Sequence, residues 1–223
     1  MYGQNEWSSN QQHFFAPIIM YTKLVNTMSQ EDARKMLHIP SDHFVYMVLG
    51  TIRNKEEKKL LERVARSLSN KEILHVAQWP FYGTKPILNT VRRFYQKIQF
   101  PKHIFKAADT IPVEQMQVYL NAADVLIIPR IHSLNSGLIS LAFSFKKTVL
   151  GPSSGNIGPI LAKSGNAIFD INNLINLVEH LEYAKKLAHQ GQGIHNFNYA
   201  TEHWSWEKVG QLHIDAYTKL LSN

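Results

Sequence analysis

Three glycine-bearing loops in this 223-residue sequence contain residue types that bind phosphate. The first begins at Gly50, in GTIRNKEEKK, and carries Arg53, Lys55 and Lys58. Glycine permits a tight turn, and the planar guanidinium of arginine matches the geometry of phosphate oxygens. The solvated start of a helix would have the same composition, so this segment alone leaves both interpretations open.

The second loop, residues 133–137, opens the apolar segment NSGLISLAFS. The first backbone N–H groups of a helix have no partner within the helix, and its dipole favours negative charge there. The N–H groups of Asn135, Ser136, Gly137 and Leu138 could therefore hold a diphosphate without a charged side chain. An ordinary loop between two core elements is the alternative interpretation.

The pattern around these loops predicts alternating strands and helices from residue 44 onward, with a third glycine loop at 151–159. Short apolar runs indicate buried strands, and amphipathic stretches indicate helices. The expected strands are 44–50, 72–78, 103–108, 124–129, 147–152 and 166–170, and the expected helices are 30–37, 55–67, 85–98, 112–123, one opening near 137, 156–163, 173–190 and 203–221. The predicted fold class is α/β, a Rossmann-like parallel sheet with helices on both faces. Ligands of such sheets bind at the carboxyl ends of the strands, so Gly50, the 133–137 loop and Gly155 should meet at one edge.

Composition limits the kinds of partner that the chain can have. A net charge of +7 could favour nucleic acid, an anionic membrane face or an acidic small ligand. The basic residues form scattered short pairs and no long run, which disfavours nucleic acid and fits an anionic ligand or peripheral membrane contact. The chain has no cysteine, no apolar run of about 18 residues and no signal-peptide pattern at its start. A cytoplasmic protein is expected, with contact at the inner face of the membrane as an option.

Other site chemistries find little support in the sequence. The eleven histidines show neither H-x-x-x-H nor H-E-x-x-H spacing, so no metal site and no cofactor are expected. A G-x-S-x-G elbow, which would indicate a serine hydrolase, does not occur.

A long central segment resembles a known family. IPVEQMQVYLNAADVLIIPRIHSLNSGLISLAFSFKKTVLGPSSGNIGPIL is similar to the nucleotide-sugar-binding, C-terminal half of GT-B glycosyltransferases, in the large retaining group that includes many polysaccharide-building enzymes. The shared order is a helix, A-A-D-V-hydrophobic-P, a glycine loop, an alanine-rich helix, G-K-P-V and a second glycine loop. SQEDARKMLHIPSDHFVYMVLGTIR and the tail WSWEKVGQLHIDAY resemble the entry and exit of the same half, so the likeness covers about residues 20–221.

The resemblance implies specific roles for residues of the loops. The arginine of the first glycine turn and a nearby lysine hold the donor diphosphate in such enzymes, which implies Arg53 with either Lys55 or Lys58. The N–H groups of the second loop also contact phosphate. Residues that border the nucleobase, mostly through their backbone, would be Ala107, Ala108, Asp109, Thr110 and Ile111. No catalytic residue can be assigned, because the acceptor site and the histidine near the sugar come from the other half of the family's fold.

The sequence departs from the family at two places. Many relatives carry two glutamates around the glycine loop, the second of which binds the ribose hydroxyls. Here the matching positions hold His132 or Ser133 and Leu141 or Ala142. The G-K-P turn is replaced by Lys146, Lys147 and Thr148, so its glycine and proline are both missing.

The expected organisation is one half of a GT-B fold. Residues 1–28 would be an N-terminal extension or interdomain segment, 29–202 the donor-binding domain, and 203–223 a C-terminal helix that packs toward a missing N-terminal domain. An apolar stripe on 206–221, or aromatic residues near Phe14, Phe15 and Tyr21, should then be partly exposed. The chain would be a fragment, a truncated product or a subunit that needs a partner.

The expected function is that of the parent enzyme. It would move a hexose from a nucleotide diphosphate-sugar to a hydroxyl acceptor, in surface polysaccharide synthesis, and this chain alone would be incomplete for catalysis. The competing hypothesis is a degenerate, non-catalytic GT-B domain that serves as a partner or scaffold. The missing glutamates favour the second hypothesis, whereas Arg53 and the Asn135-Ser136-Gly137 loop favour the first.

Overall fold

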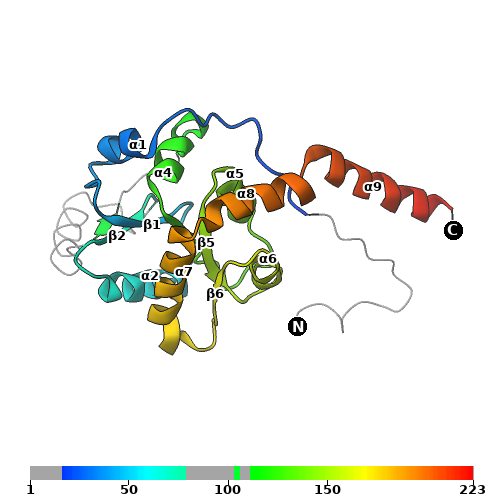
Figure 1. Ribbon diagram of the computed structural model, residues 1–223. Helices are drawn as coiled ribbons and strands as arrows, with labels where there is room; N and C mark the ends of the chain where they lie inside the picture. Colours follow the sequence, from blue (N-terminus) through cyan, green and yellow to red (C-terminus); the bar gives the residue numbers. More distant parts are fainter. Residues whose placement is uncertain (1–16, 79–102, 106–110, 223) are drawn as a thin grey trace, which may run out of the picture.

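The computed structural model describes residues 17–78, 103–105 and 111–222, and these form an α/β domain around one parallel sheet (Figure 1). The strands are β1 Phe44–Val48, β2 Glu72–Val76, β3 His103–Phe105, β4 Val125–Ile127, β5 Thr148–Pro152 and β6 Ala167–Phe169. All described pairs are parallel, in the order β3-β2-β1-β4-β5-β6. The prediction of a Rossmann-like parallel sheet is confirmed.

Helices cover both faces of this sheet, as predicted. They are α1 Gln30–Leu37, α2 Lys55–Ser67, α4 Met116–Ala122, α5 Gly137–Ser144, α6 Ile157–Lys163, α7 Leu177–His189, α8 Gln192–His203 and α9 Trp206–Leu221, with 3-10 turns at Val113–Gln115 and Leu174–Asn176. Helices α2 and α7 bury their apolar residues in one core cluster. Helices α1, α4, α5, α6 and α8 contribute to a second cluster on the opposite face. Side chains of the strands belong to both clusters, so the sheet is buried on both faces.

Local sequence signals explain where the first helices begin. The Ser29 hydroxyl accepts a hydrogen bond from the Asp32 N–H and caps α1. The Asn54 side chain caps α2 in the same way by accepting from the Glu57 N–H at 2.8 Å. Such caps satisfy N–H groups that lack a partner in the helix, and each stabilises a helix by about 1 kcal/mol.

The structure corrects several element boundaries. The helix expected over 112–123 is divided into a 3-10 turn and the shorter α4, and the strand expected over 103–108 is described only as His103–Phe105. The helix expected over 85–98 lies outside the described residues. Helix α8 was not predicted, because its sequence QGIHNFNYATEH is rich in residues with low helix propensity.

Contacts with the body of the domain hold α8 in place. A Cβ added at Gly193 would lie 1.9 Å from the Lys146 carbonyl oxygen, so only glycine allows this close approach. The Asn196 side chain is fully buried, donates to the Lys147 carbonyl at 2.8 Å and exchanges hydrogen bonds with Asn166. Lys146 itself has a left-handed backbone, with φ of 56°, at the position where the family's G-K-P turn has glycine.

The neighbouring Lys147 is partly buried, and its pKa is lowered to about 8, mainly because burial disfavours the charged ammonium. Its ammonium donates to the carbonyls of Ala123 and Asn121 at 3.0 and 3.4 Å. In the unfolded chain the pKa returns to about 10.5. Between these two pKa values the unfolded chain binds more protons than the folded chain, so stability rises with pH.

We therefore expect the free energy of unfolding to rise, relative to a Lys147→Met variant, by about 2 kcal/mol between about pH 7 and pH 10. Urea denaturation of both proteins at several pH values measures this difference. Lys186→Met, at an exposed position of α7, is the control and should stay parallel to the natural chain. If the stability of Lys147→Met also changed with pH in parallel with that of the natural chain, the pKa of Lys147 would not be lowered by folding and this prediction would be wrong.

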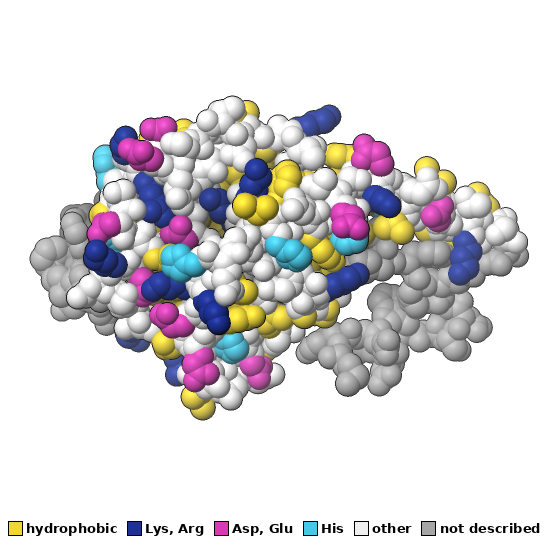
Figure 2. All heavy atoms as spheres, in the orientation of Figure 1, with side chains coloured by type: hydrophobic (Ala, Val, Ile, Leu, Met, Phe, Trp, Pro, Cys, Tyr) yellow, Lys and Arg dark blue, Asp and Glu magenta, His cyan; other side chains and the backbone are white. Residues whose placement is uncertain are grey.

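Helix α9 projects from the domain (Figure 1), and hydrophobic side chains show on its surface (Figure 2). Only Val209 of this helix is buried. Trp206, Leu212, Ile214, Tyr217, Leu220 and Leu221 are 42–88% exposed. Tyr21 is 43% exposed, whereas Phe14 and Phe15 lie outside the described residues. The expected exposure of the 206–221 stripe is confirmed. Within the described ranges, no helix combines the length and apolarity that crossing a membrane requires.

Candidate functional site

The candidate site lies where the direction of strand progression reverses. From β1 the sheet continues through β2 to β3 on one side, and from β4 through β5 to β6 on the other. In open α/β sheets, ligands bind at such a switch point, outside the carboxyl ends of the strands. Gly50 follows β1 here, and Arg130 follows β4.

The turn after β1 is tight, as Gly50 in the sequence suggested. Gly50 has φ of +83°, a left-handed conformation that side chains rarely adopt. The Arg53 N–H donates to Glu57 Oε2 at 2.8 Å, which fixes the turn onto the first turn of α2. The Arg53 side chain is exposed and forms no hydrogen bond or ion pair within the described part of the chain. A guanidinium is therefore available at the carboxyl edge of the sheet.

The two candidate lysines differ in their surroundings. Lys55 is exposed and is the first residue of α2. Lys58 lies one turn further, where its ammonium is 3.7 Å from the Glu62 carboxylate. Lys55 is thus the closer of the two, along the chain, to the Arg53 turn.

A buried ion pair that the sequence analysis missed joins β4 to this turn. Arg130 Nη1 donates to Glu57 Oε2 at 2.8 Å, and the two side chains are only 4% and 2% exposed. Burial is the main cause that lowers the pKa of Arg130, and the nearby charge of Arg53 lowers it further, against the opposing effect of Glu57. The sequence offers one sign of this pair, which is an arginine placed directly after the apolar run DVLIIP.

The second and third glycine loops pack against each other. A Cβ added at Gly155 would lie 2.5 Å from the carbonyl oxygens of Ser133 and Leu134. The Asn156 N–H donates to the Leu134 carbonyl at 2.7 Å, and its side-chain amide donates to Asn135 Oδ1 at 2.9 Å. The two loops therefore form one unit.

This unit is also tied to the Gly50 turn, through Arg130. The Ser154 hydroxyl donates to the Arg130 carbonyl at 3.1 Å. Arg130 Nη2 lies 3.0 Å from the point where a Cβ on Gly50 would stand. The predicted meeting of Gly50, the 133–137 loop and Gly155 at one edge is confirmed.

At this edge, the N–H groups of Asn135 to Leu138, which open helix α5, donate to no acceptor among the described residues. Its N-cap residue, Ser136, makes no side-chain capping bond. The Gly137 position tolerates a Cβ, whose nearest contact would be the Tyr21 hydroxyl at 3.4 Å. The segment that carries Tyr21 is held along α5, because Ser140 donates to the Ile19 carbonyl and the Tyr21 N–H donates to Ser144.

A small pocket lies beside these loops. It encloses about 290 Å³ and is lined by Ile131, His132, Ser133, Leu134, Ser154, Gly155 and Ile171. Three of the described lining residues have aliphatic side chains, and none of them carries a carboxylate. At the positions where relatives have glutamates, His132 is exposed, whereas Leu141 and Ala142 are buried in the core.

The residues expected to border a nucleobase are described only in part. Ala107, Ala108, Asp109 and Thr110 lie outside the described residues. Ile111 is described and packs, partly buried, against the core cluster that contains α1, α4 and α5. The position of a nucleobase therefore stays a prediction.

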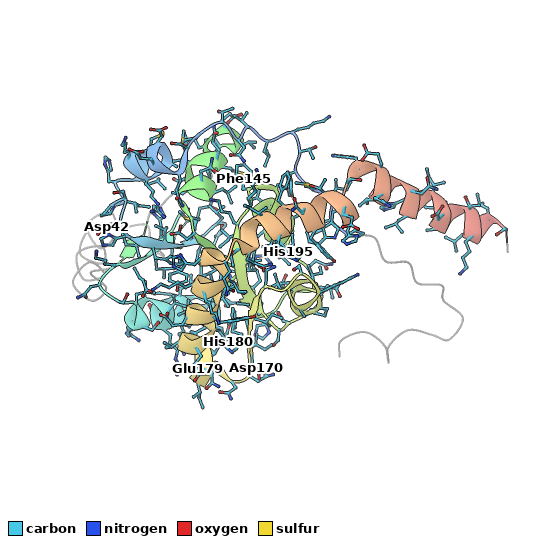
Figure 3. The ribbon with its side chains drawn as sticks, viewed as in Figure 1. Asp42, Phe145, Asp170, Glu179, His180 and His195 are labelled. Atoms are coloured by element: carbon cyan, nitrogen blue, oxygen red, sulfur yellow. The ribbon has the colours of Figure 1, made fainter. Side chains whose placement is uncertain are left out.

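Titratable residues on the α7–α8 side of the domain do not gather into a metal site. His180 lies on α7 and His195 on α8, and Glu179 stands in the first turn of α7 (Figure 3). Asp170 follows β6, and its carboxylate accepts from the Asn172 N–H. In the part of the chain that the structure describes, no group of three His, Asp or Glu residues could hold a metal ion.

Three solved structures with this fold are glycosyltransferases or sugar-phosphate synthases. Sucrose-phosphate synthase from Thermosynechococcus elongatus aligns over 93% of this chain and 52% of its own, with 15% identity and a TM-score of 0.70. The C-terminal domain of a glycosyl transferase group 1 family protein from Francisella tularensis aligns over 82% of this chain and 96% of its own, with 13% identity and a TM-score of 0.60. HepE of Anabaena, solved with UDP-glucose, aligns over 90% and 57%, with 11% identity and a TM-score of 0.61.

These likenesses identify the fold. The chain has the α/β Rossmann-like fold of the C-terminal half of GT-B glycosyltransferases and spans about half the length of sucrose-phosphate synthase and of HepE. Other similar structures include glycosyltransferases of lipopolysaccharide synthesis. No protein-family model and no curated protein sequence matches the chain.

Proposed function

We propose that this chain is the donor-binding half of a retaining hexosyltransferase. The enzyme would move a sugar from a nucleotide diphosphate donor to a hydroxyl group of a growing surface polysaccharide. Its GT-B fold supports transfer from a nucleotide-sugar, since HepE was solved with UDP-glucose. The lipopolysaccharide enzymes among its structural neighbours support a surface glycan as product.

One observation carries this proposal. The exposed Arg53 side chain, which has no partner among the described residues, and the uncapped start of α5 belong to loops that meet at one sheet edge. A positive guanidinium and free N–H groups are the partners that a diphosphate requires. In the transfer step they would stabilise the negative charge that develops on the departing nucleoside diphosphate.

We assign the remaining contacts as part of the same proposal. Gly50 would let the backbone approach the phosphates, and Asn135, Ser136, Gly137 and Leu138 would donate their N–H groups. Lys55 would be the partner of Arg53, because Lys58 already faces Glu62. Residues 107–111 would border the base.

We further propose that an N-terminal GT-B domain, or a partner chain that replaces it, covers the apolar side of α9. In this scheme residues 1–28 are an N-terminal extension or interdomain segment, 29–202 the donor domain and 203–223 the helix that packs toward the first domain. The exposed residues of α9 support this assignment, because apolar side chains gathered on an exposed surface commonly mark a binding site. Association with a membrane face stays a prediction from the net charge of +7.

Calorimetry on this chain tests the donor site. UDP, ADP and GDP are titrated beside their nucleosides at one salt concentration, because charged contacts are screened by salt. A nucleoside diphosphate should bind more tightly than its nucleoside, and Arg53→Ala should remove about 1.5–3 kcal/mol of that difference. Arg63→Ala, at an exposed position further along α2, is the matched control and should change nothing.

Two further variants sharpen the result. Gly137→Val should weaken diphosphate binding by filling the phosphate's space, and the fold should survive because the new Cβ would contact only the Tyr21 hydroxyl closely. Comparing Lys55→Ala with Lys58→Ala decides which lysine contributes. Equal binding of nucleoside and nucleoside diphosphate by the natural chain would contradict the donor site and leave the scaffold hypothesis in its place.

A further inference from the structure

Arg130 and Glu57 form a buried ion pair whose presence stability does not explain. The pair lies at 2.8 Å with both side chains almost fully buried. Taking two charges out of water is costly, and apolar residues of similar volume in place of such a pair are often neutral or stabilising. A pair of this kind at a ligand-binding edge therefore suggests a role in binding.

The Arg130 guanidinium has N–H groups that the ion pair with Glu57 does not use. Arginine carries five N–H groups. The described residues accept one hydrogen bond from this side chain, the one from Nη1 to Glu57. Its Nη2 faces the Gly50 turn, 3.0 Å from where a Cβ would stand on that glycine. No described residue accepts a hydrogen bond from the other N–H groups of Arg130, so these groups are available to a ligand that enters at this turn.

Glu57 couples this guanidinium to the turn that carries Arg53. The same oxygen, Oε2, accepts from Arg130 Nη1 and from the Arg53 N–H, each at 2.8 Å. Glu57 is itself fixed, because its own N–H donates to the Asn54 cap. The two arginines and one carboxylate leave a net positive charge beside Gly50, which suits an anion.

We propose that Arg130 is a second guanidinium of the donor diphosphate site and that Glu57 is its positioning residue. This inference rests on the proposed function. Arg130 would donate to phosphate oxygens from beneath the Gly50 turn, while Arg53 approaches from the solvent side. Because Gly50 has no Cβ, Arg130 Nη2 can lie close against this turn, and the two guanidinium groups would then hold the diphosphate from two directions.

The test measures how much tighter a nucleoside diphosphate binds than its nucleoside. Titrations use UDP, ADP and GDP with their nucleosides, and inorganic pyrophosphate as a probe without a base. In Arg130→Met this preference should fall about tenfold or more, and pyrophosphate binding should weaken equally. Because Arg130→Met leaves Glu57 buried without its partner, a Glu57→Gln, Arg130→Met double variant is measured beside it.

Arg34→Met is the matched control. Arg34 is also buried and paired, with Asp124 at 2.7 Å, but at the amino ends of the strands. The Arg34→Met protein should be less stable than the natural chain but should still bind a nucleoside diphosphate more tightly than the nucleoside. This result separates a general effect on folding from the loss of a contact with the ligand. Thermal melts establish that each variant is folded before it is titrated.

The outcomes separate the two proposals. If the natural chain shows no preference for the diphosphate, the proposed function fails. If the natural chain has the preference and Arg53→Ala removes it, while a folded Arg130 variant retains it, the role of Arg130 alone is overturned. A loss in the Arg130 variants that Arg34→Met does not share supports the second guanidinium.

Discussion

Gly193→Ala should lower the free energy of unfolding by about 3 kcal/mol, at the upper end of the usual cost of overpacking. The added methyl group would lie 1.9 Å from the Lys146 carbonyl oxygen and 2.7 Å from its carbonyl carbon. Both atoms belong to the backbone, so no side chain can rotate away. Relief would require α8 to move off the sheet, which would break the buried hydrogen bonds of Asn196.

Urea denaturation measures this loss, and Gly210→Ala is the matched control. Gly210 is also a helical glycine, in α9, but a Cβ there would meet nothing within 4 Å. Alanine favours helix over glycine, so this variant should gain about 0.5–1 kcal/mol. A Gly193→Ala protein as stable as the natural chain would show that α8 does not dock through this glycine.

The same helix shows where prediction from sequence ends. Helix α2 was predicted with its correct bounds, because Lys55–Ser67 has a clear apolar stripe, and the structure adds an Asn54 cap immediately before it. Helix α8 has neither a clear stripe nor a side-chain cap. Its Gly193 and Asn196 disfavour a helix locally. They stabilise it through contacts with residues 30 to about 50 positions earlier, namely Lys146, Lys147 and Asn166. Tertiary contacts of this kind are not visible in local periodicity.

The site divides in a similar way. The meeting of the glycine loops could be predicted, because the carboxyl ends of parallel strands share one edge of the sheet. The ion pair of Arg130 with Glu57 could not, since it joins residues 73 positions apart. It depends on β1 lying next to β4, and the order of strands along the chain does not reveal their order in the sheet. The resemblance to glycosyltransferases did not indicate this pair either, because the motifs that carry the resemblance assign no role to Arg130 or Glu57.

Gly155→Ala should destabilise the domain by about 2–4 kcal/mol and should weaken diphosphate binding as well. Two costs add. With φ of +53° the backbone is left-handed, which costs a residue with a Cβ about 1–2 kcal/mol. The methyl group would also lie 2.5 Å from the carbonyl oxygens of Ser133 and Leu134, so overpacking adds about 1–2 kcal/mol. Because those carbonyls belong to the loop that opens α5, their displacement should move the N–H groups proposed to hold the diphosphate.

Gly165→Ala separates these two costs. Gly165 is also left-handed, with φ of +73°, but a Cβ there would meet only the flexible Gln192 side chain, at 3.7 Å. This variant should lose only about 1–2 kcal/mol and should bind a nucleoside diphosphate as the natural chain does. Denaturation and calorimetry on both variants give four measurements. Equal losses of stability would mean that the loops at 133–137 and 151–159 are not packed as one unit. A Gly155→Ala protein that is less stable but binds normally would mean that this unit does not set the position of the α5 N–H groups, and those groups would then lose their part in the donor site.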